Sequence, residues 1–189
     1  MKRRCLAVLA AVGCLLVATQ SSLGADKLNT SYISTTPGSS SVLWVAKEAK
    51  IFDKHGIDAT VIFISGSVRG IQSILAGEIA IGEGGGPGLA SARLAGGDVV
   101  AIAGNVNVLP YYLVSQPGIK KQEDLRGKIG GTHIAGTTAE FALKVGLKKI
   151  GLDPLKDVSL RVIGGAIERM VALQKGIVNF TVVTEAGKA

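Results

Sequence analysis

The stretch Ser65-Gly-Ser-Val-Arg-Gly-Ile-Gln-Ser-Ile-Leu-Ala-Gly77 is repeated in outline by Gly164-Gly-Ala-Ile-Glu-Arg-Met-Val-Ala-Leu-Gln-Lys-Gly176. The glycine and apolar positions of the two copies align at a constant separation of 99 residues. Each copy predicts a glycine turn after a strand, a helix with apolar positions three apart, and a glycine that ends the helix. This separation is too long for a solenoid repeat. The repeat predicts two similar α/β lobes, with a cleft between them where a small ligand could bind.

Strands and helices alternate along the rest of the chain. Apolar, β-branched runs predict strands at 59–64 and 99–103, and helical periodicity predicts a helix at 138–150. Alternation of this kind is typical of doubly wound, mainly parallel sheets, in which ligands bind beyond the carboxyl ends of the strands. We expect lobe 1 to cover residues 26–116 and lobe 2 to cover residues 117–189.

The N-terminus has the three parts of a secretory signal peptide. Residues 2–4 are basic, residues 5–18 are apolar, and small residues that favour cleavage after Gly24 or Ala25 follow. About fourteen apolar residues are fewer than the ~20 that a transmembrane helix needs. We therefore expect residues 1–25 to be removed and the mature chain to be periplasmic. Cleavage before a lipidated Cys14 is the alternative.

Composition excludes several classes of function. Both cysteines, Cys5 and Cys14, lie in the expected signal peptide, so the mature chain has no thiolate for a disulfide, a metal or nucleophilic catalysis. The formal net charge of +7 falls to +4 without the signal, and the lysines are scattered with few aromatic residues, unlike a nucleic-acid-binding surface. Neither histidine has a second ligand at metal-binding spacing, and no catalytic elbow is visible. We expect no metal, no enzymatic activity and no nucleic-acid partner.

Five short motifs occur in order along the chain, at 43–58, 75–80, 123–128, 151–158 and 172–176. Together they resemble the ABC-transporter substrate-binding proteins for nitrate, sulfonate, taurine and thiamine-pyrimidine precursors. The resemblance implies a two-lobed periplasmic-binding-protein fold, a small-molecule ligand, an importer permease as partner and no cofactor. It also implies a longer chain that returns to the first lobe. We therefore expect a nearly complete first sheet and an incomplete second lobe, in which a strand at 180–183 lacks neighbours.

Three turns at predicted helix starts carry hydroxyl groups or glycines. Hydroxyls and free backbone N–H groups at a helix start bind oxygen-rich anions, although such residues also simply cap helices. We interpret the turns as ligand contacts because they follow strands on both sides of the predicted cleft. Arg69 lies one turn into a predicted helix and could pair with an acid group or face solvent, and the glycine-rich turn that contains Gly85 and Gly86 could approach a ligand. The candidate ligand-binding residues are Ser39, Ser40, Ser65, Gly66, Ser67, Arg69, Gly85, Gly86, Gly136, Thr137 and Thr138.

Other residues near the predicted cleft have weaker signals. His133 ends a predicted strand and could donate a hydrogen bond, and Tyr111 could stack on a ligand, although packing is the usual role of such an aromatic residue. The glycine-rich run at 82–88 lacks the spacing of a dinucleotide or phosphate-binding loop.

We interpret the chain as an exported solute-binding protein that captures a small, anionic or oxygen-rich molecule for an ABC importer. One alternative, to which the resemblance extends, is a pyridoxal-phosphate-dependent synthase of the thiamine-pyrimidine precursor. The signal peptide argues against this enzyme, and no lysine is marked as a Schiff-base former. A ligand-sensing receptor domain is the other alternative, which the sequence does not separate from transport.

Overall fold

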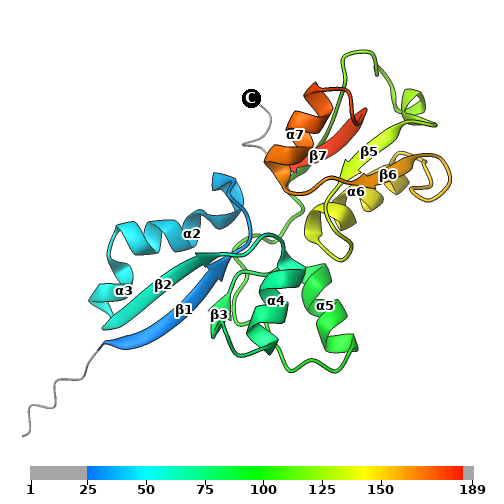
Figure 1. Cartoon of the computed structure of the whole chain (residues 1–189). Coiled ribbons are helices and arrows are strands. Elements are labelled where there is room, and N and C mark those ends of the chain that lie inside the picture. The colour runs from blue at the N-terminus through cyan, green and yellow to red at the C-terminus, as the bar shows by residue number, and fades with distance from the viewer. Residues whose placement is uncertain (1–24, 185–189) are drawn as a thin grey trace, which may run out of the picture.

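The structure is a computed structural model that describes residues 25–184, and it consists of two α/β lobes (Figure 1). Nearly all of the expected signal peptide and the last five residues lie outside the described part. The first sheet has the strand order β2-β1-β3 and is entirely parallel. Its elements are β1 (Asp26–Tyr32), α2 (Pro37–Glu48), α3 (Ile51–Lys54), β2 (Ile57–Phe63), α4 (Ser67–Leu75), β3 (Ile81–Gly82) and α5 (Gly86–Leu94).

The second sheet has the order β4-β7-β5-β6. Strands β5, β6 and β7 are parallel, and β4 runs antiparallel to β7. The elements are β4 (Tyr111–Ser115), the 3₁₀ helix η1 (Gln122–Leu125), β5 (Ile129–Thr132), α6 (Thr138–Lys149), β6 (Ser159–Val162), α7 (Ala166–Gln174) and β7 (Phe180–Thr184). The two-lobed fold with mainly parallel sheets is therefore confirmed.

The sequence repeat corresponds to α4 and α7. Gly66 and Gly165 are the N-caps of these helices, and neither helix has a capping side chain there. Gly77 and Gly176 follow the C-caps with positive φ angles of 76° and 71°. Glycine reaches this left-handed region without the steric cost that other residues meet. The repeat therefore puts a glycine at the start and after the end of one helix in each lobe, although the N-cap backbones differ, with φ 82° at Gly66 and −64° at Gly165.

The main hydrophobic core lies in the second lobe. Leu143 and Leu147 of α6 are fully buried and pack with Phe180 and Val182 of β7. A second cluster joins α7 to Val178, at the turn before β7. Burying each such side chain contributes about 1.5–3 kcal/mol. Apolar contacts with α6 and α7 therefore stabilise the second sheet.

Two sequence expectations about strands were wrong. Residues 99–103 form no strand, because no neighbouring strand of the described residues pairs with them, and Val100 and Ile102 are exposed. Strand β7, expected at 180–183 without neighbours, lies between β4 and β5. Both depend on strand pairing, which the local sequence does not encode. Strand β4, just before the expected lobe boundary at residue 116, pairs with β7 of the second sheet. Within residues 25–184, no helix is both long and apolar enough to cross a membrane.

Candidate functional site

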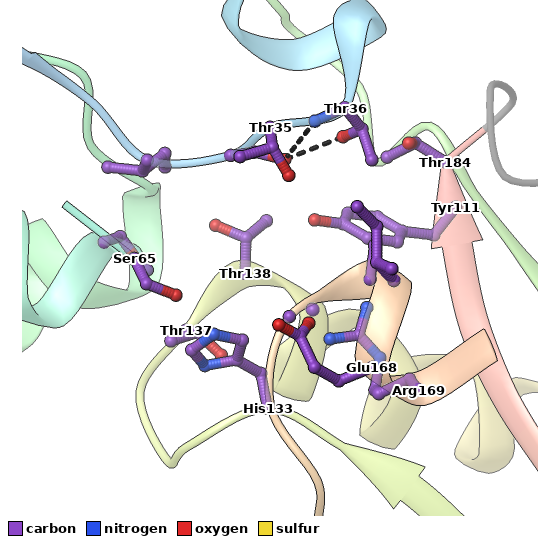
Figure 2. Close-up of a pocket in the computed structure, with 18 of the residues that line it drawn as sticks. Thr35, Thr36, Ser65, Tyr111, His133, Thr137, Thr138, Glu168, Arg169 and Thr184 are labelled. Atoms are coloured by element: carbon purple, nitrogen blue, oxygen red, sulfur yellow. Dashed lines mark hydrogen bonds between the residues drawn. The ribbon is translucent and has the colours of Figure 1, made fainter. Parts of the chain in front are cut away.

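A pocket of about 390 Å³ lies between the two lobes (Figure 2). Its walls come from residues at or just after the carboxyl ends of β1 and β2 in the first lobe and of β5, β6 and β7 in the second, together with Tyr111 from β4. The site is therefore where parallel sheets are expected to bind ligands.

Four helix N-termini meet at this pocket. The N-cap residues Thr36 of α2, Gly66 of α4, Thr137 of α6 and Gly165 of α7 all line it. Each helix start carries a partial positive charge and backbone N–H groups that have no partner inside the helix. Because the N-caps of α4 and α7 are glycines, no capping side chain competes for those groups. The backbone alone therefore makes the pocket favourable for an anion.

Arg169 places a buried positive charge beside the same pocket. Its side chain is held by three hydrogen bonds, which it donates to Thr181 Oγ1 (3.1 Å), to the Gly164 carbonyl (2.6 Å) and to the Val182 carbonyl (3.0 Å). The residue is 2% exposed, and no ion pair among the described residues involves it. The fixed guanidinium adds to the attraction for an anionic ligand, and the nearby Glu168 carboxylate offsets part of its charge.

Hydroxyl groups supply further polar contacts. Ser67 is 1% exposed, and its Oγ has no hydrogen-bond partner within the described residues, as is also true of Thr184 Oγ1. Both residues line the pocket. An unsatisfied buried hydroxyl costs stability unless a ligand or water completes its hydrogen bonds. These two atoms are therefore candidate ligand contacts.

His133 closes the pocket from the second lobe (Figure 2). Its Nδ1 accepts a hydrogen bond from the Ile134 N–H (2.8 Å), so the neutral ring carries its proton on Nε2. Burial and the charges of Arg169 and Arg69 lower the pKa of His133, while Glu168 opposes this shift. The ring is therefore a neutral hydrogen-bond donor at neutral pH.

The structure brings five of the sequence-predicted residues to the pocket: Ser65, Gly66, Ser67, Thr137 and Thr138. They come from the turns before α4 and α6, one in each lobe. The two turns therefore line the same pocket from opposite lobes, and their contact with a ligand stays a prediction.

Other predicted residues lie elsewhere. Arg69 is exposed and does not line the pocket, where the arginine is Arg169 instead. Gly85 is the N-cap of α5 and faces Thr138, whereas Gly86 has open space where a side chain would begin. Gly136, with a φ of +81°, packs against Val68 of the other lobe. None of these three glycines is among the residues that line the pocket.

Ser40 was predicted to lie in the turn before the first long helix, but it lies within that helix. Helix α2 begins at Pro37, because proline is favoured at the first helical position, so its N-cap is Thr36. Ser40 therefore lies inside the first turn, where its Oγ donates to Glu83 Oε2 at 2.6 Å. The side chain of Ser39 lies outside the described part of the structure. Ser40 does not line the pocket, whereas Ser34, Thr35 and Thr36 do.

Several pocket residues of the second lobe were not predicted from the sequence, among them Gly165, Glu168, Arg169 and Thr184. The repeat offered a signal for one of them, since Gly165 is the counterpart of Gly66 at the 99-residue separation. Arg169 has no such signal, because its contacts with β7 arise only in the folded sheet. No group of three His, Cys, Asp or Glu residues within 25–184 could hold a metal ion.

Two lobes joined around a pocket at the carboxyl ends of their strands define a protein with the periplasmic-binding-protein fold. The structure is similar to the alkanesulfonate-binding protein SsuA from Xanthomonas axonopodis pv. citri bound to MOPS, with a TM-score of 0.68 and 22% identity over 84% of this chain and 54% of that one. The structure is also similar to the aliphatic sulphonate-binding protein SsuA from Escherichia coli. The TM-score is 0.66, and the identity is 19% over 86% of this chain and 55% of that one. At these identities the likeness establishes the fold.

The sequence model described as NMT1/THI5 like matches residues 39–186, so the chain belongs to this family. A protein of Brucella abortus (strain 2308) that is named as a binding protein is 33% identical over 121 residues, which are 64% of this chain and 36% of that protein. The chain thus spans about a third of the length of this relative and about half that of the two solved structures.

Proposed function

We propose that the chain is the ligand-capturing part of an exported solute-binding protein, which holds a small anionic or oxygen-rich molecule between its lobes and delivers it to an ABC importer. The family and the two-lobed fold support capture of a small molecule. The importer permease is proposed as the partner because the solved proteins of similar fold include a binding component of an ABC phosphonate transporter from Pseudomonas aeruginosa. An enzymatic role has no support from these relatives.

The observation that carries this proposal is the meeting of four helix N-termini and the buried Arg169 at one pocket. Each helix start favours a nearby anion by about 0.3–1 kcal/mol at an exposed site, and by up to ~2 kcal/mol in a partly buried geometry. The charge of Arg169 acts in the same direction. Contributions of this size from both lobes favour an acid group that bridges them.

The ligand also completes the arrangement of the lobes in this proposal. Ser67 belongs to α4 in the first lobe, and Thr184 belongs to β7 in the second. A ligand that satisfies hydroxyls of both lobes gains all its contacts only when the lobes are together. Binding would therefore shift the population toward that arrangement.

The test is a calorimetric titration of the full chain with sulfonates, nitrate, bicarbonate, pyrimidines and aromatic carboxylates. We expect acids to bind and neutral pyrimidines to bind less tightly or not at all. Ser67→Ala should weaken acid binding by about tenfold, the effect of one lost hydrogen bond to a charged group. Ser91→Ala, on the exposed surface of α5, is the matched control. Preference for the neutral compounds, or equal affinity in both variants, would contradict the proposal.

Export is a separate part of the proposal. Strand β1 begins at Asp26, immediately after the expected cleavage position, so removal of residues 1–25 would leave every element of the first sheet in place. Mass spectrometry of the secreted protein should give an N-terminus at Ala25 or Asp26. A diacylated Cys14 would instead make the protein a lipoprotein.

A further inference from the structure

Glu83 connects the elements that form the first-lobe wall of the pocket, although it does not line the pocket itself. It follows β3 directly, and its backbone N–H donates to the Ser31 carbonyl of β1 (2.8 Å). Its side chain is half-buried, and Oε2 accepts the hydrogen bond from Ser40 Oγ (2.6 Å) in the first turn of α2. Because Ser40 is fully buried, this hydrogen bond fixes the start of α2 against the end of β3.

A second contact joins the same carboxylate to the pocket wall. The backbone N–H of Ile33, the residue after β1, also donates to it. The Ile33 carbonyl in turn accepts from the N–H of Gly66, the N-cap of α4 (3.1 Å). Ile33 and Gly66 both line the pocket. One side chain therefore links the ends of β1 and β3 to the starts of α2 and α4, which lie on opposite faces of the first sheet (Figure 1).

The turn between β1 and α2 carries hydroxyl groups of the pocket. Its members that line the pocket are Ser34, Thr35 and Thr36. Ser34 Oγ lies 2.7 Å from Thr36 Oγ1 and accepts from the Thr36 N–H (3.1 Å), as the dashed lines beside Thr36 in Figure 2 show. These local hydrogen bonds fix the shape of the turn but not its place on the sheet. That place depends on Ile33 before the turn and Ser40 after it, and both donate to Glu83.

We propose that Glu83 is a positioning residue for ligand binding, whose carboxylate holds the β1–α2 turn and the start of α4 where they contact an acid. This inference rests on the proposed function, because it assumes that the pocket binds an acid. A ligand gains the contacts of this wall only from molecules in which the wall is in place, so the apparent affinity falls with their fraction. Glu83 thus acts on binding through backbone and hydroxyl groups that it holds.

Three variants separate the hydrogen bonds of Glu83 from its charge. Glu83→Ala removes the acceptor, Ser40→Ala removes one donor, and Glu83→Gln keeps a side-chain oxygen that accepts from Ser40. Lys47→Met is the matched control, because it removes the hydrogen bond that Lys47 Nζ donates to the Ala59 carbonyl (2.6 Å) at the other end of α2. The affinity of the full chain for ethanesulfonate, nitrate and benzoate is measured by calorimetry.

We expect Glu83→Ala to lower the affinity for an acid about tenfold, the size of the population shift that one lost hydrogen bond causes. Ser40→Ala should act in the same direction, and the double variant should bind no more weakly than Glu83→Ala alone. Glu83→Gln should bind equally well or more tightly, because the oxygen remains and a charge that repels the acid is gone. Without ligand, hydrogen exchange of the Gly66 amide should accelerate in Glu83→Ala. Lys47→Met should change neither the affinity nor this exchange.

The outcomes separate this inference from the proposed function. If the wild type binds an acid and Glu83→Ala binds it equally well, Glu83 does not position the wall, but the anion pocket stands. Ser40→Ala applies the same criterion should Glu83→Ala not fold. If Glu83→Gln loses as much affinity as Glu83→Ala, the charge and not the hydrogen bonds is required, and the inference is wrong. If the wild type binds none of the three acids, the proposed function fails and this inference fails with it.

Discussion

The contact between the lobes at Gly85 gives the sharpest prediction. A Cβ built on Gly85 would overlap Thr138 Oγ1, and it would stand 3.2 Å from Ser67 Oγ, whereas real Cβ atoms essentially never come closer than 3.0 Å to another atom. The backbone of Gly85, with φ −97° and ψ 144°, suits any residue, so Gly85→Ala introduces steric overlap without backbone strain. Overpacking of this kind costs about 1–3 kcal/mol. The melting temperature should fall by roughly 2–12 °C.

Gly86→Ala is a matched control one residue away. Apart from its chain neighbours, no atom lies within 4 Å of the place where a Cβ of Gly86 would stand, so the cost of Gly86→Ala is limited to the restriction that Pro87 puts on the residue before it. We expect a smaller loss of stability for this variant than for Gly85→Ala in urea unfolding. Thr138→Ala removes the overlapping Oγ1, so the double variant with Gly85→Ala should recover much of the lost stability, with a coupling energy of about 1 kcal/mol. Equal stability of Gly85→Ala and Gly86→Ala, or strictly additive effects, would refute the reasoning.

Three further predictions concern single side chains. Arg169→Met removes three hydrogen bonds of a buried guanidinium and should cost on the order of 3 kcal/mol or more in free energy of unfolding, measured in urea; a loss below 1 kcal/mol would contradict the structure. Burial raises the pKa of Glu83 above 4.5, and the hydrogen bond from Ser40 opposes this shift. The contribution of Glu83 to the free energy of unfolding is therefore present below pH 4.5 and is lost as pH rises through the folded-state pKa. As pH rises from 4.5 through the folded-state pKa, the wild type should therefore lose stability relative to Glu83→Gln. Parallel profiles of stability against pH for the two proteins would disprove this prediction. Thr137→Ala removes the α6 N-cap and should cost about 1 kcal/mol in free energy of unfolding, whereas Ser65→Ala should cost little. Both variants should weaken ligand binding. Equal thermal stability of the two variants would show that the cap contributes nothing.

The parts of the fold that the sequence predicted are those encoded locally. The starts and ends of α4 and α7 follow from the glycines that flank each helix. The helices themselves follow from apolar periodicity within nine residues. Strand pairing is not local. The segment 99–103 has the apolar composition of a strand but no partner in the described structure, and β4 joins the second sheet through residues almost 70 positions away. Composition therefore predicted which segments could be strands, but not their neighbours.

The candidate site divides in the same way. The turns before α4 and α6 were predicted because hydroxyl residues follow strands there, and both line the pocket. Ser40 was predicted as a ligand contact but does not line the pocket. Pro37 carried the signal for this, since proline at the first helical position makes Thr36 the N-cap and puts Ser40 inside the helix. Arg169 could not be predicted, because its burial results from contacts with β7 and with the loop before α7.

The pocket and the Gly85 contact involve the same two helix starts, and this links ligand binding to the arrangement of the lobes. Gly85 touches Ser67 of α4 and Thr138 of α6, and both of those residues also line the pocket. A ligand that contacts both helix starts and a close approach at Gly85 favour the same relative position of the lobes, so disturbing one must weaken the other. Gly85→Ala should therefore lower the affinity for a bound acid although Gly85 itself lies off the pocket wall, whereas Gly86→Ala should not. An unchanged affinity in Gly85→Ala, measured by the same calorimetry, would mean that the pocket forms without this contact.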